Sequence, residues 1–150
     1  MAHRGNGRHT RSRAVKSVKV GDYMSRKLVT FKPRTNVVEA IAVILEHGIS
    51  GVPVVDDDGR LVGMLSEVDV MRVVIQDSYY DEGMGIVEDY MSRTVDTVDP
   101  DVDIYTLAER FMKERRRRYP VVSREGKLVG QLSRRDVLQA ALDFLAHAKT

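Results

Sequence analysis

The sequence predicts an α+β fold in which one small module of alternating strands and helices (an α/β order) occurs twice. Three observations support this prediction. The stretch GMLSEVD at 63–69 returns as GQLSRRD at 130–136, which is 67 residues later. At the same shift, 19 of the 52 positions between 20 and 71 are identical without a gap. Within each copy the apolar spacing alternates between that of a strand and that of a helix. An internal duplication of this kind predicts two copies of one structural unit.

Each copy is expected to open with a short strand and an amphipathic helix. The strands are predicted at 28–31 and 95–98, each followed closely by a proline. The helices carry an apolar stripe at i, i+3, i+4, i+7 and i+8, which we expect to face a core. The stripes consist of Val37, Ala40, Ile41, Ile44 and Leu45 in the first copy, and of Ile104, Leu107, Ala108, Phe111 and Met112 in the second. Gly48 is expected to end the first helix in a left-handed conformation.

A β-hairpin and a second helix complete each copy. VPVVDDDGRLVGML at 52–65 is typical of strand, turn and strand, with DDDG as the turn. YPVVSREGKLVGQL at 119–132 is its counterpart, and the second helices are predicted to start at Ser66 and Ser133. A unit of about 60 residues buries too little surface to be stable alone, so we expect the two copies to pack together. The predicted division is a tail at 1–17, a first domain at 18–76, a linker at 77–85 and a second domain at 86–148.

Composition excludes several classes of protein. The chain is 43% hydrophobic and 31% charged, which is typical of a globular protein, and no apolar run reaches the length of a membrane span. It has no cysteine, which excludes disulfides and thiolate nucleophiles. No pairing of a nucleophile with a base, and no cluster of metal ligands, recurs in the two copies. We therefore predict a cytoplasmic protein without a membrane partner, which is not an enzyme and needs no catalytic cofactor or metal.

Charge is distributed unevenly along the chain. Residues 1–20 hold six Lys or Arg and no acid, whereas the other 130 residues are net negative by four. A tail of this composition cannot bury enough apolar surface to offset its ordering entropy, so residues 1–17 are expected to be disordered. Two interpretations stay open for it: contact with nucleic acid or another acidic partner, or a solubilising leader.

The repeated S-x-x-D motif also has two interpretations. As local structure, Ser66 with Asp69 and Ser133 with Asp136 would cap the following helices, because the acid lies three residues after the serine and complements the helix dipole. As a binding device, a helix N-terminus offers N–H groups to a phosphate. A carboxylate in the first turn can accept hydrogen bonds from a ribose 2′,3′-diol. The two roles are compatible.

The two copies differ most just before the hairpin. KERRRRYP at 113–120 stands where the first copy has EHGISGVP at 46–53, so that four consecutive arginines replace Gly-Ile-Ser-Gly. A run of charge is often only a solvated face. On a strand its members would point alternately to opposite sides. Guanidinium groups also match the geometry of phosphate oxygens, so a phosphate site is the second interpretation.

Taken together, these motifs resemble a tandem pair of CBS domains, the modules named after cystathionine β-synthase. The resemblance covers about 18–146 and rests on DYM before the first strand, PVV in the hairpin, G-x-LVG after the turn and G-x-L-S-x-x-D entering the last helix. It implies two domains related by a pseudo-twofold axis, with two clefts between them. It further implies a stand-alone regulatory module that binds AMP, ADP, ATP or S-adenosylmethionine, associates as a homodimer and signals to an unknown protein partner.

The resemblance also implies which residues contact the ligand, with each cleft drawing on both copies. The serines and aspartates would hold phosphate and ribose, adenine would lie near Ile49, Val52 and Tyr119, and Arg117 and Arg118 would meet phosphates. One cleft would combine Ser66, Asp69, Thr97, Arg117, Arg118, Tyr119 and Pro120. The other would combine Ser133, Arg134, Arg135, Asp136, Thr30, Ile49, Ser50, Gly51, Val52 and Pro53. Because their basic residues differ, we expect the two sites to be unequal, and the site with Asp69 to favour phosphorylated ligands.

Two further function classes stay open from the sequence. The basic tail and the arginines at 115–118 would suit a nucleic-acid-binding protein, whose affinity should fall steeply with salt. A ligand-free structural dimer or adaptor would keep the fold but leave both clefts unused.

Overall fold

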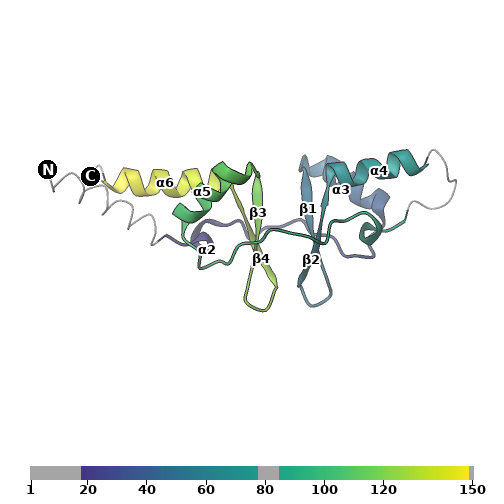
Figure 1. Cartoon of the computed structure of the whole chain (residues 1–150), viewed down its shortest axis with the longest axis horizontal. Helices are drawn as coiled ribbons and strands as arrows, with labels where there is room; N and C mark the ends of the chain where they lie inside the picture. The colour runs from purple at the N-terminus through teal and green to yellow at the C-terminus, as the bar shows by residue number, and fades with distance from the viewer. Residues whose placement is uncertain (1–17, 78–84, 149–150) are drawn as a thin grey trace. The chain divides into compact units, whose positions relative to one another are not determined.

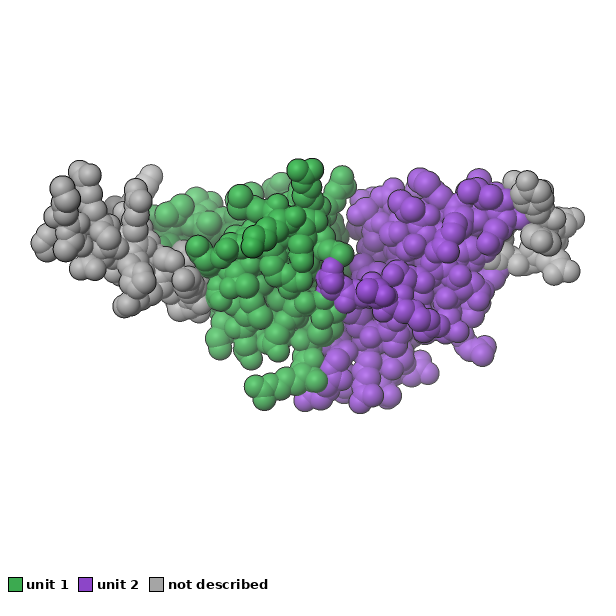
Figure 2. All heavy atoms as spheres, in the orientation of Figure 1, with its two compact units in different colours: residues 1–28, 97–124, 129–150 green, residues 29–96, 125–128 purple. Residues whose placement is uncertain are grey.

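The computed structural model describes residues 18–77 and 85–148, which form two compact units (Figures 1 and 2). Among the described residues, unit 1 comprises 18–28, 97–124 and 129–148, and unit 2 comprises 29–77, 85–96 and 125–128. The predicted tail at 1–17 and most of the predicted linker lie outside the described residues. No helix in the described ranges is both long enough and apolar enough to cross a membrane.

Unit 2 is built around a two-stranded antiparallel sheet. Its elements are α3 (Val37–His47), β1 (Gly51–Val55), β2 (Leu61–Ser66), α4 (Glu67–Asp77) and the short 3₁₀ helix η1 (Val87–Asp89). In the sheet Val52 pairs with Leu65 and Val54 with Gly63. The core contains residues from the sheet, from the helices and from the segments next to them. It consists of Phe31, Val37, Ala40, Ile44, Val52, Val54, Leu65, Val70, Val73, Val87, Tyr90 and Met91.

Unit 1 repeats this arrangement with the second copy of the sequence. Its elements are α2 (Val20–Tyr23), α5 (Ile104–Glu114), β3 (Arg118–Val122), β4 (Leu128–Ser133) and α6 (Arg134–Ala148). Strands β3 and β4 form the sheet. The core consists of Val20, Val98, Ile104, Leu107, Phe111, Tyr119, Val121, Leu132 and Ala140. The two cores therefore follow the same pattern, as the duplication predicted.

The first helix of each copy is fixed by its ends. The Asn36 side chain accepts hydrogen bonds from the N–H groups of Val38 and Glu39 and so caps α3, and Gly48 ends it at φ 61°, which confirms the expected left-handed stop. In α5 the cap is Asp103, which accepts from Thr106. Arg115 takes the left-handed position at φ 55°, where an arginine is less favourable than a glycine.

Two sequence predictions about these elements are wrong. The strands expected at 28–31 and 95–98 are only single parallel bridges, Phe31 with Val54 and Val98 with Val121. The neighbouring residues of the partner strands, Pro53 and Pro120, accept hydrogen bonds through their carbonyls but have no N–H to extend the ladder. The apolar stripes are also narrower than predicted, because Leu45 is 76% and Met112 82% exposed.

Each unit combines most of one repeat with the DYMSR segment of the other. Residues 22–26 lie in unit 1 with the second repeat, and 89–93 lie in unit 2 with the first. In unit 1 the backbone N–H groups of Ser25 and Gln131 each donate to the carbonyl of the other, at 2.8 and 3.0 Å. Met64 and Ser92 make the same exchange in unit 2, at 2.9 Å in both directions. The repeated DYMSR segment therefore pairs with the β1–β2 or β3–β4 hairpin of the other repeat in both units.

The DDDG turn has the chemistry predicted for it. Asp56 Oδ1 accepts hydrogen bonds of 2.9 Å from the backbone N–H groups of both Asp58 and Arg60. Gly59 completes the turn at φ 81°, a conformation that favours glycine. Asp56 and Gly59 thus shape the β1–β2 turn.

Candidate functional site

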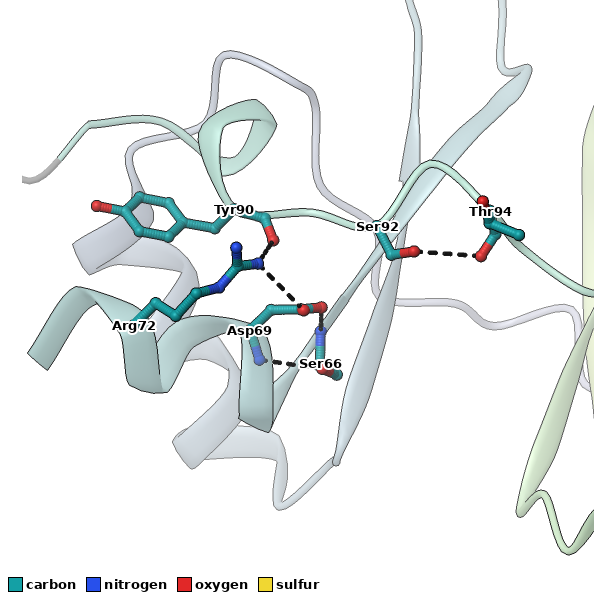
Figure 3. Close-up of polar contacts among 6 residues, drawn as sticks. All are labelled: Ser66, Asp69, Arg72, Tyr90, Ser92 and Thr94. Atoms are coloured by element: carbon teal, nitrogen blue, oxygen red, sulfur yellow. Dashed lines mark hydrogen bonds and ion pairs between the residues drawn. The ribbon is translucent and has the colours of Figure 1, made fainter. Parts of the chain in front are cut away.

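The repeated Ser and Asp form the same helix cap in both units. In unit 2 the Ser66 N–H donates to Asp69 Oδ2 at 2.9 Å, and the Asp69 N–H donates to Ser66 Oγ at 3.1 Å (Figure 3). In unit 1 the corresponding distances between Ser133 and Asp136 are 2.8 and 3.3 Å. This reciprocal pair is a capping box, so the structural interpretation of the S-x-x-D motif is confirmed.

The cap leaves room for a second role of each aspartate. A carboxylate has about four acceptor positions, and each capping hydrogen bond uses one of them on Oδ2. Both carboxylates are half-buried at the start of α4 or α6, where helix N–H groups and the helix dipole favour negative charge. The site is therefore preorganised to accept hydroxyl donors and to hold an anion nearby.

Arg72, which is not among the site residues predicted from the sequence, distinguishes the two caps. Its Nη2 lies 3.4 Å from Asp69 Oδ1 and donates at 2.6 Å to the carbonyl of Tyr90, as Figure 3 shows. The residue at the equivalent place in the second repeat is Gln139, which donates instead to Asp143 Oδ1 at 2.8 Å. The i, i+3 spacing of Asp69 and Arg72 on one helix is the sequence feature that could have predicted this contact. Asp69 is thus held by a cation on its own helix, and Asp136 has a glutamine at that position.

The arginine run falls on three different local structures. Arg115 ends α5, Arg116 and Arg117 lie between α5 and the sheet, and only Arg118 belongs to β3. The alternation predicted for a strand therefore does not apply to the whole run. The Arg116 carbonyl accepts from Arg134 Nε at 2.8 Å, which ties the run to the first turn of α6. The side chains of Arg117 and Arg118 are exposed, as a phosphate contact requires.

The apolar candidates differ in what they offer a ligand. Val52 and Tyr119 are fully buried in their cores, so in this structure their side chains face the core and only their backbone groups could serve a ligand. Ile49 is half-buried against the core of unit 2. Pro53 and Pro120 are buried, and their carbonyls already accept from Phe31 and Val98.

The predicted site residues divide between the two units. Unit 2 holds Thr30, Ile49, Ser50, Gly51, Val52, Pro53, Ser66 and Asp69. Unit 1 holds Thr97, Arg117, Arg118, Tyr119, Pro120, Ser133, Arg134, Arg135 and Asp136. Within unit 2, the Glu67 N–H donates to the Ser50 carbonyl at 2.9 Å, which brings the segment before β1 to the start of α4. The crossed pairing of residues from the two sets stays a prediction.

Tyr119 is held by an aromatic and ionic cluster inside unit 1. Its ring packs edge-on against Phe111 with centroids 4.8 Å apart, and the Arg110 guanidinium lies 4.5 Å from its centroid. Its hydroxyl donates to the Glu114 carboxylate. Burial, reinforced by this hydrogen bond and by the charge of Glu114, raises the pKa of Tyr119 from 10.0 to about 12. The hydrogen bond from Tyr119 is also the main cause that lowers the pKa of Glu114.

Tyr119 is therefore expected to ionise at a higher pH in the folded protein than in the unfolded chain. The folded state holds the phenol proton more tightly than the unfolded chain, so this stabilisation is complete below pH 10.0 and is lost as pH rises through about 12. The phenolate absorbance of the wild type and of Tyr119→Phe can be measured after a rapid pH jump, before the protein unfolds. We predict that the difference between the two titrates with a pKa near 12. A difference curve centred near the ordinary tyrosine pKa would contradict the buried, hydrogen-bonded position of this ring.

Comparison with known proteins places both repeats in one family model. A model described as "CBS domain" matches residues 20–76 and 87–143. The chain is 34% identical over 126 residues to uncharacterized protein MK0525 of Methanopyrus kandleri, which covers 83% of this chain and 63% of that protein. It is 29% identical over 152 residues to the chloroplastic CBS domain-containing protein CBSX1 of Arabidopsis thaliana, covering 83% of this chain and 64% of the relative. The chain thus spans less than two thirds of the length of these relatives.

Solved structures share the fold over most of the chain. A structure of CBSX2 in complex with AMP has a TM-score of 0.73 and 31% sequence identity, covering 85% of this chain and 98% of that one. The CBS domain pair of protein MJ0100, in complex with 5′-methylthioadenosine and S-adenosyl-L-methionine, has a TM-score of 0.65 and 25% identity. It covers 89% of this chain and 98% of its own.

Proposed function

The chain belongs to the CBS domain family as a tandem pair, and we propose that it is a regulatory module that binds adenosine ligands. The observation that carries the proposal is the structure of CBSX2 with AMP, which is 31% identical to this chain over 85% of its length. Binding would act through a change of conformation or of affinity for a partner, not through catalysis. The ligand is AMP, ADP, ATP or S-adenosylmethionine.

The local chemistry of the two caps supports this proposal. Asp69 and Asp136 each present a half-buried carboxylate whose orientation is fixed by the backbone N–H of the serine three residues earlier. A ribose diol would donate to the remaining acceptor positions of that carboxylate, and a phosphate would meet the serine hydroxyl and the helix N-terminus. Fixing the acceptor in advance lowers the entropy cost of binding a small polar ligand.

The two sites are proposed to be unequal because their charges differ. Asp69 has Arg72 beside it, whereas Asp136 has Gln139 at the equivalent position. Arg117 and Arg118 are proposed to contact phosphates, and Arg134 and Arg135 to supply the positive charge near Asp136. The first repeat has the neutral Ser50 and Gly51 where the second has Arg117 and Arg118. Because guanidinium groups bind phosphate strongly, phosphorylated ligands should bind the two sites with different affinities.

A thermal-shift panel tests the proposal. The ligands are AMP, ADP, ATP, S-adenosylmethionine, GTP and a short RNA. A ligand present at 100 times its dissociation constant that binds only the folded state should stabilise it by about 2.7 kcal/mol. We expect a rise in melting temperature with one or more adenosine ligands and none with GTP. A rise with RNA alone, lost as salt increases, would replace the proposal with nucleic-acid binding. If no nucleotide changes the melting temperature at millimolar concentration, the result would favour a ligand-free structural adaptor instead.

A further inference from the structure

Helices α4 and α6 each present an equivalent row of three polar residues that begins with the capping aspartate. The spacing i, i+3 and i+7 places the members of a row on one side of the helix. In α4 the row contains one negative and one positive charge, and it consists of Asp69, Arg72 and Gln76. In α6 it contains two negative charges and no positive one, and it consists of Asp136, Gln139 and Asp143. The two caps therefore differ in charge one turn farther along their helices.

The last residue of each row is held by the tyrosine of a DYMSR segment. The Tyr90 hydroxyl donates to Gln76 Oε1 at 2.8 Å, and the Tyr23 hydroxyl donates to Asp143 Oδ2 at 2.7 Å. Asp143 Oδ1 also accepts from Gln139 Nε2 at 2.8 Å. The two rows are thus held in the same way, so their difference in charge comes from the residue types and not from a difference in fold.

Arg72 is anchored by one nitrogen and turns the rest of its guanidinium to solvent. Its Nη2 donates to the Tyr90 carbonyl at 2.6 Å and lies 3.4 Å from Asp69 Oδ1 (Figure 3). The side chain is 55% exposed, and within the described ranges no acceptor is bonded to Nε or Nη1. Because a guanidinium has five N–H donors, several of them stay available beside the carboxylate that is proposed to bind ribose.

We propose that Arg72 makes the Asp69 site selective for adenosine ligands that carry a second phosphate, on the ribose 2′ or 3′ oxygen. This inference rests on the proposed function. The remaining ribose hydroxyl would donate to Asp69, and the added phosphate would accept from the available donors of Arg72, whose planar fork matches phosphate oxygens. At Asp136 the added phosphate, with about 1.5–2 negative charges at pH 7, would meet a row with two carboxylates and a neutral amide.

The cations at the start of α6 do not give the Asp136 site this property. Arg134 and Arg135 precede Asp136, at the helix N-terminus where the 5′ phosphate is proposed to bind. Arg72 instead follows Asp69 by three residues, so it lies nearer to the C-terminal end of its helix. The order of the charges along the two helices thus gives only the Asp69 site a cation after the ribose carboxylate.

Single-site variants allow each cap to be titrated alone by calorimetry at constant ionic strength. In Asp136→Ala, which keeps the Asp69 site, the ligands are AMP, adenosine 2′,5′-bisphosphate and adenosine 3′,5′-bisphosphate. We expect at least one bisphosphate to bind about tenfold more tightly than AMP. Adding Arg72→Gln should remove this preference while AMP affinity changes by less than about threefold, so AMP binding reports that the site is still folded. Arg60→Gln, which removes an exposed cation before β2 of the same unit, is the matched control and should keep the preference.

Transfer of the row to α6 tests the same inference as a gain of selectivity. In Asp69→Ala, which keeps the Asp136 site, the changes Gln139→Arg and Asp143→Gln copy the row of α4. We expect a preference of about tenfold for a bisphosphate over AMP to appear in this variant. Arg135→Gln should instead weaken the binding of AMP and of both bisphosphates alike, because Arg135 is proposed to serve the 5′ phosphate that all three ligands share.

The outcomes separate this inference from the proposed function. Three results would overturn the inference alone: an Asp69 site that binds AMP at least as tightly as both bisphosphates, a preference that Arg72→Gln leaves unchanged, or an Asp69 site that binds none of the three ligands while the wild type binds AMP. Failure of the wild-type chain to bind AMP or either bisphosphate would overturn the proposed function itself, and this inference with it.

Discussion

Asp69→Ala and Asp136→Ala are each expected to weaken AMP binding at their own site at least about 100-fold, because each would remove the two charge-assisted hydrogen bonds proposed for the ribose, at roughly 1.5–3 kcal/mol apiece. The measurement is a calorimetric titration of AMP into each variant. The double variant should bind no AMP at millimolar ligand. Wild-type affinity in the double variant would contradict the assignment of the ribose contacts to these two aspartates.

The controls must separate binding from helix capping, since both aspartates also accept a backbone hydrogen bond from the preceding serine. Loss of a capping side chain costs about 1 kcal/mol of folding stability. Asp69→Asn and Asp136→Asn keep an oxygen for the serine N–H but lose the charge and one ribose acceptor. We expect these variants to unfold like the wild type in urea and to bind AMP much more weakly. A parallel loss of stability and affinity would instead show that the caps are only structural.

Gly130→Ala is expected to lower the free energy of unfolding by about 3 kcal/mol in urea unfolding, because overpacking of this kind costs about 1–3 kcal/mol. A Cβ at this position would lie 2.5 Å from Met24 Sδ and 2.9 Å from the Ser25 carbonyl oxygen. Moving Ser25 away would break its two backbone hydrogen bonds with Gln131. The glycine of the repeated motif is therefore required by the DYMSR segment that crosses the hairpin.

Two variants make this stability prediction specific. Gly51→Ala is the matched control, because a Cβ there would meet nothing nearer than 3.6 Å. Met24→Ala combined with Gly130→Ala should recover part of the loss, since it removes the sulfur but not the carbonyl from the path of the new methyl group. Equal unfolding free energies for Gly130→Ala and Gly51→Ala would contradict the close approach of the segment and the hairpin.

The duplication made most of the local structure predictable from sequence. Ser66, Asp69 and their counterparts were identified as helix caps because the reciprocal hydrogen bonds need only the spacing of the two residues. Gly48 was predicted as a helix stop for a similarly local reason. The exchange of DYMSR between the repeats could not be predicted, because a repeated motif does not reveal which of two similar hairpins it pairs with.

Burial and charge were less predictable because they depend on tertiary packing. Leu45 and Met112 satisfy the helical period, yet they lie at the edge of their stripes, beyond the face that the core covers. The alternation expected for the arginine run assumes a strand, whereas Arg115 ends a helix in a left-handed conformation that the sequence does not favour. Arg72 was missed because its role beside Asp69 also depends on the Tyr90 carbonyl, which is 18 residues away along the chain.

A calorimetric titration of AMP into the wild-type chain tests whether this CBS pair binds an adenosine ligand. We expect saturable heat with a dissociation constant below about 1 mM, and occupancy of up to two sites per chain, one for each cap, with unequal affinities. No saturable heat with AMP, ADP, ATP or S-adenosylmethionine at millimolar concentration would contradict it.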